Sequence, residues 1–123
     1  MVIFVGDEPS AKNKDPEVPF VGTKSMKNLL DWMYILEVDV NNVLVCNRHQ
    51  IHKNGEIRVP GLTSSYLPGD RIIALGNKAS KHLNELTFGH FKLPHPSGLN
   101  RKLNDEKFIK SELNRCKEWL NER

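Results

Sequence analysis

Short apolar runs that alternate with amphipathic segments are the feature that most constrains the fold of this chain. Val2–Val5 is a continuous apolar run that ends at Gly6, and the predicted strand Arg71–Leu75 contains a second run, Ile72–Leu75, that ends in a Gly turn. Continuous apolar runs are typical of strands that are buried on both faces, as in parallel sheets. Val38–Cys46 is rich in β-branched residues and predicts another strand, and Phe91–Leu93 predicts a last short one.

The segments between these runs predict helices. From Ser25, a suitable N-cap, apolar residues recur at helical spacing, and similar patterns begin near Asn77 and at Asp105. Residues 47–70 lack a helical period and predict an irregular excursion with a small hairpin around Asn54–Gly55. Strands separated by helices predict a three-layer α/β/α fold with a small, mainly parallel four-stranded sheet.

Length and composition narrow the class of protein. The chain has 123 residues, of which 38% are hydrophobic, and we expect a single domain over residues 1–123. The formal net charge of +3 permits an anionic partner. The first apolar run is too short for a signal peptide or a membrane span, so we expect a soluble protein without a membrane partner. Cys46 and Cys116 lie far apart, which favours reduced thiols and an intracellular, cytoplasmic location.

Ligands of open parallel sheets bind beyond the carboxyl ends of the strands. We therefore expect "GDEPS", the Asn41–Asn42 region and "HPSGLNR" to converge on one crevice. In the first of these, Pro9 stiffens the turn and holds Asp7 and Glu8 at the mouth, where a carboxylate could act as a base or stabilise a cation. A solvated turn is the plainer interpretation of the same residues.

The other two segments carry amide, imidazole and turn chemistry. The amide of Asn41 or Asn42 can make a paired donor and acceptor contact with a base edge, although a structural Asn explains the residue equally well. In "HPSGLNR", a tight turn leaves backbone N–H groups free to meet phosphate, His95 points into the crevice, and Arg101 adds positive charge.

Two further residue types have plainer alternatives. Phe20 in "PFVG" could stack on a planar ligand, but a lone Phe is more often part of a core. His49 and His52 have no supporting ligand at a suitable spacing except Cys46, so we expect no metal site.

Taken in order, these motifs resemble the uracil-DNA glycosylase superfamily. "VGDEPS" is similar to its first motif, and "VPFVGTKSMKNLL" resembles a segment of its thermostable family. "VDVNNVLVC" and "RIIALGNKASKHL" resemble two of its strands, and "HPSGLNR" is similar to its second motif, with a mismatch-specific ending. The resemblance implies an enzyme of base excision repair that hydrolyses the N-glycosidic bond of a flipped uracil or modified pyrimidine in damaged DNA. It implies a monomer acting on single- or double-stranded DNA.

The resemblance also implies catalytic roles. A carboxylate would stabilise the positive charge on the sugar and orient water, and this role falls on Glu8, with Asp7 and Asp15 as alternatives. His95 would stabilise the negative charge on the departing base.

Substrate and DNA contacts are implied in the same way. Phe20 would stack on the flipped base, and Asn42 would bind its edge, with Asn41 as the alternative in register. Leu99 would be the wedge that fills the vacated stack. The residues placed against the DNA are Ser10, Ser25, Ser97, Gly98, Leu99, Asn100 and Arg101.

Two departures from the family pattern shape the expectations. The thermostable family usually binds an iron–sulfur cluster through four cysteines, whereas this chain has two, so we expect no cofactor. The alternative function is a catalytically inactive glycosylase-like fold that binds DNA, a nucleotide or a protein. An unrelated flavodoxin-like hydrolase explains the order of the motifs less well. In the glycosylase interpretation, Glu8, Phe20, Asn42 and His95 must line one pocket.

Overall fold

The computed structural model describes residues 1–6, 24–59, 61–96 and 105–122, and of residues 24 and 25 only the backbone. Its main sheet has four strands in the order β2-β1-β5-β6, and each neighbouring pair is parallel. The small parallel sheet predicted from the apolar runs is therefore confirmed. The strands are β1 (Val2–Gly6), β2 (Val43–Asn47), β5 (Arg71–Leu75) and β6 (Phe91–Leu93).

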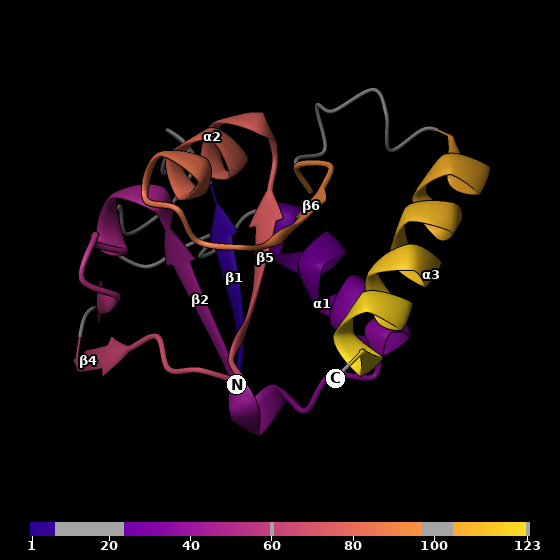
Figure 1. Cartoon of the computed structure of the whole chain (residues 1–123). Helices are drawn as coiled ribbons and strands as arrows, with labels where there is room; N and C mark the ends of the chain where they lie inside the picture. The colour runs from indigo at the N-terminus through magenta and orange to yellow at the C-terminus, as the bar shows by residue number, and fades with distance from the viewer. Residues whose placement is uncertain (7–23, 60, 97–104, 123) are drawn as a thin grey trace.

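Helices cover both faces of this sheet, as predicted for a three-layer fold. Helices α1 (Lys24–Leu36) and α3 (Glu106–Asn121) lie together on one face, and α2 (Asn77–Glu85) lies on the other (Figure 1). Two separate apolar clusters fill the spaces between the layers. Within the described ranges, no helix is both long and apolar enough to cross a membrane.

The buried face of α1 follows the helical period. Leu29, Trp32, Met33 and Leu36 are spaced at i, i+3, i+4 and i+7 and are buried against the sheet. Leu30 also belongs to the sequence pattern that predicted an apolar face, yet it is 52% exposed. At about 100° per residue, the four buried side chains share one side of the helix, and Leu30 lies beyond the edge of that side.

The C-terminal helix begins where the sequence predicted. The carboxylate of Asp105 caps α3 by accepting a hydrogen bond from the Phe108 N–H at 3.0 Å. Leu113 and Cys116 are buried against the sheet, whereas Phe108 is 36% exposed. Phe108 belongs to the apolar pattern that begins at Asp105 and predicts the core side of this helix, yet it lies at the boundary with solvent.

The second strand differs from its predicted range, Val38–Cys46. Asp39 Oδ1 accepts a hydrogen bond from Asn41 N at 2.9 Å, and its carbonyl accepts one from Asn42 N at 2.8 Å. These local bonds fold Val40–Asn42 into a short 3₁₀ turn, η1, because Asp and Asn compete with strand pairing. The strand therefore starts only at Val43. Asn41 and Asn42 lie at its amino end, and the prediction that they follow the strand is wrong.

The excursion between β2 and β5 contains a second, two-stranded sheet. It comprises η2 (Arg48–Gln50), β3 (Glu56–Val59) and the antiparallel β4 (Leu62–Ser65). At Asn54–Gly55, where a small hairpin was predicted, the chain makes a tight turn: His52 N donates to Glu56 O at 2.9 Å, and Gly55 has a φ of 86°. An isolated bridge between Ile51 and Ile57 spans this turn, and the paired strands β3 and β4 are joined instead after Val59.

Both cysteines are buried free thiols, and they lie on opposite faces of the sheet. Cys46 belongs to the cluster under α2, and Cys116 belongs to the cluster under α1 and α3. Burial raises the pKa of the Cys46 thiol to about 12. Burial, together with the negative charge of Glu112, raises the pKa of the Cys116 thiol to about 12. Neither thiol is ionised near neutral pH.

We predict that the folded protein does not react with a disulfide reagent at pH 8. With the pKa of each thiol raised to about 12, only about one thiol in ten thousand is a thiolate at that pH, and burial also keeps the reagent away from the sulfur. Unfolding in guanidinium chloride should expose both thiols, which then react at the rate of free cysteine. Fast reaction of either thiol in the folded protein would contradict this account.

Candidate functional site

The sheet order predicts a ligand site beyond β1 and β5. The chain leaves β1 through α1 on one face to reach β2, and it leaves β5 through α2 on the other face to reach β6. β1 and β5 are neighbours, so the connections diverge between them. Ligands of open α/β sheets bind at this switch point, outside the carboxyl ends of the strands. The segments that follow Gly6 and Leu75 both start there.

Gly76 shapes the connection that follows β5. Its φ of 104° and ψ of 172° are in a region that essentially only glycine occupies. This conformation turns the chain from β5 into α2, and Gly76 N donates to Leu93 O at 2.9 Å. Asn77 and Lys78, the first residues of α2, are thereby brought beside the carboxyl end of β6.

Asn47 is the last residue of β2, an outer strand of the sheet, and pairs in register with Gly6 at the carboxyl edge. It is only 1% exposed, and its backbone N–H donates to Gln50 Oε1 at 2.8 Å. Its side chain lies over the η2 backbone as in a capping box, yet neither Oδ1 nor Nδ2 makes a hydrogen bond of acceptable geometry. Leaving a buried polar group without a partner costs about 1–3 kcal/mol, which a ligand with a matching edge would offset.

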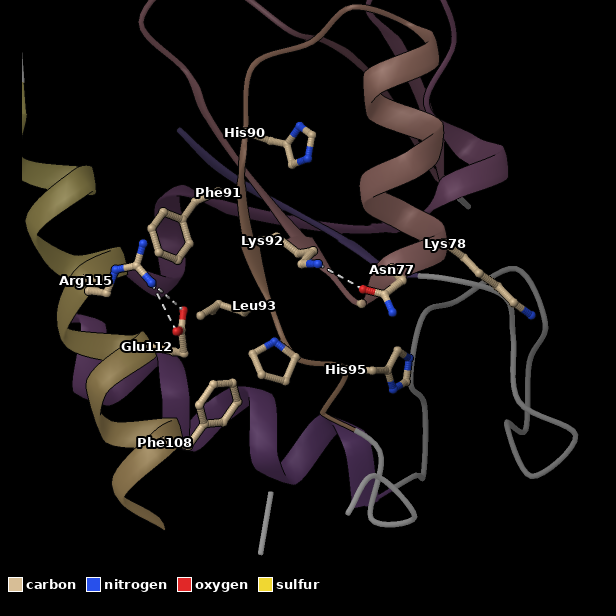
Figure 2. A pocket seen from close by; sticks show the side chains of 12 residues that line it. Asn77, Lys78, His90, Phe91, Lys92, Leu93, His95, Phe108, Glu112 and Arg115 are labelled. Carbon is tan, nitrogen blue, oxygen red and sulfur yellow. Dashed lines mark hydrogen bonds and ion pairs between the residues drawn. The ribbon is translucent and has the colours of Figure 1, made fainter. Parts of the chain in front are cut away.

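His95 lies two residues beyond the end of β6 and is half-buried. The carbonyl of the next residue, Pro96, accepts a hydrogen bond from Asn28 Nδ2 at 2.7 Å, which fastens this segment to α1. His95 lines a hollow with a volume of about 760 Å³ (Figure 2). We call it the β6 hollow; its walls are residues 76–78, the segment 90–95, Phe108, Glu112 and Arg115.

A second histidine of the β6 hollow has a structural role. His90 Nε2 lies 2.8 Å from Ser80 Oγ, and His90 Nδ1 lies 2.9 Å from the Phe88 carbonyl oxygen. Both ring nitrogens are engaged, so His90 joins α2 to the entry of β6.

The structure brings together only some of the residues predicted for the site. His95 lies at the carboxyl edge, and the backbone of Ser25 lies in the first turn of α1, close in sequence to Asn28. Asn41 and Asn42 are exposed at the opposite edge of the sheet and do not share a pocket with His95. The other predicted site residues lie outside the described residues: Asp7, Glu8, Ser10, Asp15, Phe20, Ser97, Gly98, Leu99, Asn100 and Arg101.

Sequence reasoning missed Asn47, although a signal was present. A polar amide directly follows the apolar run Val43–Cys46, at the carboxyl end of a buried strand. The predicted strand instead started at Val38, and the amides inside that longer segment were assigned to the site.

The residues present do not fit an iron–sulfur cluster. The two thiols of the chain lie on opposite faces of the sheet, and four thiolates at one place are needed. Among the described side chains, no group of three or more His, Cys, Asp or Glu residues could hold a metal ion.

The fold and the site define a small α/β protein with a buried amide and a histidine at the carboxyl edge of its sheet. The family model of the uracil DNA glycosylase superfamily matches residues 1–121, so the chain belongs to this superfamily. A comparison with curated proteins returned no match. Membership supports a function of the DNA glycosylase type in general, with DNA as the partner.

We predict that Asn47→Leu leaves the free energy of unfolding unchanged or raises it by about 1 kcal/mol, because it removes a buried amide without partners. Asn28→Leu is the matched control, and it should lower the free energy of unfolding by about 1 kcal/mol, since Asn28 donates to Pro96 O. Urea unfolding of both variants measures the difference. A loss of stability that is larger in Asn47→Leu than in Asn28→Leu would contradict this view of Asn47.

Proposed function

We propose that this protein hydrolyses the N-glycosidic bond of a flipped uracil or modified pyrimidine in DNA, as a step of base excision repair. The observation that carries the proposal is the buried amide of Asn47, which lies at the carboxyl edge of the sheet over the η2 backbone without a hydrogen bond of acceptable geometry. A glycosylase reads an extruded base through hydrogen bonds to its Watson–Crick edge. A uracil edge offers a carbonyl and an N–H, which match the donor and acceptor of one amide.

In this proposal Asn47 takes the edge-reading role that the resemblance had suggested for Asn42. Asn42 is exposed at the amino end of β2, at the edge of the sheet opposite the carboxyl ends of the parallel strands. Asn47 is held by the strand and by the Gln50 contact to its backbone, so its side chain is oriented before a base arrives.

His95 is proposed to stabilise the departing base. Breaking the bond leaves negative charge on the base and positive charge on the sugar, and an imidazole beside the base stabilises the former. General acid–base help of this kind is typically worth about 10²–10⁴-fold in rate. The carboxylate that stabilises the sugar cation stays a prediction, with Glu8 first and Asp7 and Asp15 as alternatives.

The test is excision from oligonucleotides that contain one uracil, either as single strands or opposite guanine or adenine, followed by alkaline cleavage of abasic sites. The wild-type protein should release uracil from at least one of these substrates. Asn47→Ala should slow release by about 10–100-fold, the loss expected for one bidentate base contact. His95→Ala should slow it by about 10²–10⁴-fold.

Asn42→Ala is the matched control for Asn47→Ala and should keep the wild-type rate within about twofold, since surface substitutions have small effects. Glu8→Gln should lower activity as strongly as His95→Ala if Glu8 supplies the carboxylate. DNA binding without release of uracil from any substrate would contradict excision and favour a binding module. Loss of activity in Asn42→Ala but not in Asn47→Ala would contradict the assignment of the amide.

A further inference from the structure

We propose that the β6 hollow binds an unpaired nucleotide that flanks the target nucleotide, so that the protein selects single-stranded DNA. The inference rests on the proposed function, which supplies the identity of the polymer. The hollow shares His95 with the proposed base site, so a ligand in it is the immediate neighbour of a base at His95. Its volume of about 760 Å³ is within the range of small-ligand pockets, which is ample for one nucleotide.

One wall of the hollow suits a phosphate. Lys92 Nζ donates to Asn77 Oδ1 at 3.0 Å, an interaction that uses the oxygen of the amide and leaves its Nδ2 group as a donor (Figure 2). Lys78 follows Asn77 at the rim of the hollow, and its exposed side chain extends outward (Figure 2). Cations and amide donors are the groups that hold DNA phosphates and set the register of a strand.

The charges on the α3 wall largely cancel. Arg115 Nη1 lies 3.2 Å from a Glu112 carboxylate oxygen, so this pair adds little net charge. Apart from the histidines, the positively charged residues of the described lining that are not paired with a carboxylate there are Lys78 of α2 and Lys92 of β6. The net positive charge of the hollow favours an anionic occupant.

The α3 wall also carries an aromatic ring that the core does not use. This ring is Phe108, which is 36% exposed and belongs to neither apolar cluster. By contrast, Phe91 of β6 is already engaged: it packs against Trp119 with ring centroids 5.7 Å apart and has Arg115 over its ring at 5.9 Å. Figure 2 shows Phe108 on α3, across the hollow from Asn77 and Lys78 on α2.

Positive charge opposite an exposed aromatic ring favours a single strand over a duplex. Proteins that bind single-stranded DNA combine a basic groove with aromatic side chains on which bases stack. A base within a duplex is stacked on both faces and cannot offer one to Phe108. The hollow therefore fits an unstacked base on Phe108 and its phosphate on the Lys92–Asn77 wall.

The test is the affinity for a fluorescent, uracil-free oligothymidylate, measured by fluorescence anisotropy. Phe108→Ala should weaken binding by about fivefold or more, the loss expected for one stacked base. Tyr34→Ala is the matched control, because Tyr34 is an aromatic residue of α1 that is 86% exposed and lies outside the hollow. It should change affinity by less than about twofold, and Phe108→Ala should change the affinity for a duplex equally little.

Lys92 provides an independent test of the phosphate wall. Lys92→Gln should weaken binding and lower the salt dependence of the affinity by about one phosphate contact. Lys110→Gln, an exposed lysine of α3 outside the hollow, is the matched control. Phe108→Trp should keep the affinity, and its added fluorescence should be quenched by single-stranded DNA, as expected only of a ring that contacts a base.

Equal affinities of Phe108→Ala and Tyr34→Ala for the single strand would overturn the inference, as would no binding of the single strand by the wild-type protein. An equal loss of duplex binding in Phe108→Ala would also overturn it. Since the probe contains no uracil, the two proposals fail separately. If the protein releases uracil but Phe108→Ala binds the single strand as tightly as the wild type, only the role of the hollow is contradicted. If Phe108→Ala weakens binding but the protein releases no uracil, only the proposed function is contradicted.

Discussion

Burial of β1 on both faces is the constraint on which the rest of the structure depends. Ile3, Phe4 and Val5 have no exposed surface, and their side chains alternate between the two apolar clusters. A strand of this kind needs neighbours on both edges and helices over both faces. Parallel pairing then collects every carboxyl end at one edge of the sheet, which is where Gly6, Asn47 and the residues after β5 and β6 meet.

The site is built from groups that add little to stability. Asn47 is buried without a partner for its amide, and Gly76 holds a backbone conformation that side chains disfavour. The buried amide costs free energy in the folded protein, whereas glycine adopts the Gly76 conformation without strain and a side chain there would not. Asn47 places a donor and an acceptor at the carboxyl edge of the sheet, and Gly76 places the first residues of α2 at the β6 hollow.

The sequence predicts the fold well because its strongest signals come from buried elements. The runs that form β1 and β5 are apolar enough to be recognised as strands from the sequence alone, and Asp105 marks the start of α3. The site is less predictable because it depends on where a strand ends. Asp39 folds the residues before β2 into a turn, so the strand starts later than its sequence pattern predicts. For this reason the amide at the carboxyl edge is Asn47, whereas the predicted Asn42 lies at the opposite edge of the sheet. Whether Phe108 faces the core or solvent depends on a rotation of less than one helical turn, and the apolar period of the sequence does not resolve so small a difference.

The central claim is that the Asn47 amide is held in place for a base. The most direct measurement is the ¹⁵N–¹H spectrum of the side-chain amides, recorded in the His95→Ala variant to slow turnover while a uracil-containing single strand is added. Binding should shift the Asn47 Nδ2 resonances as new hydrogen bonds form, and the exposed Asn42 resonances should stay in place. Saturation of the protein with this DNA without any change at Asn47 would contradict the account.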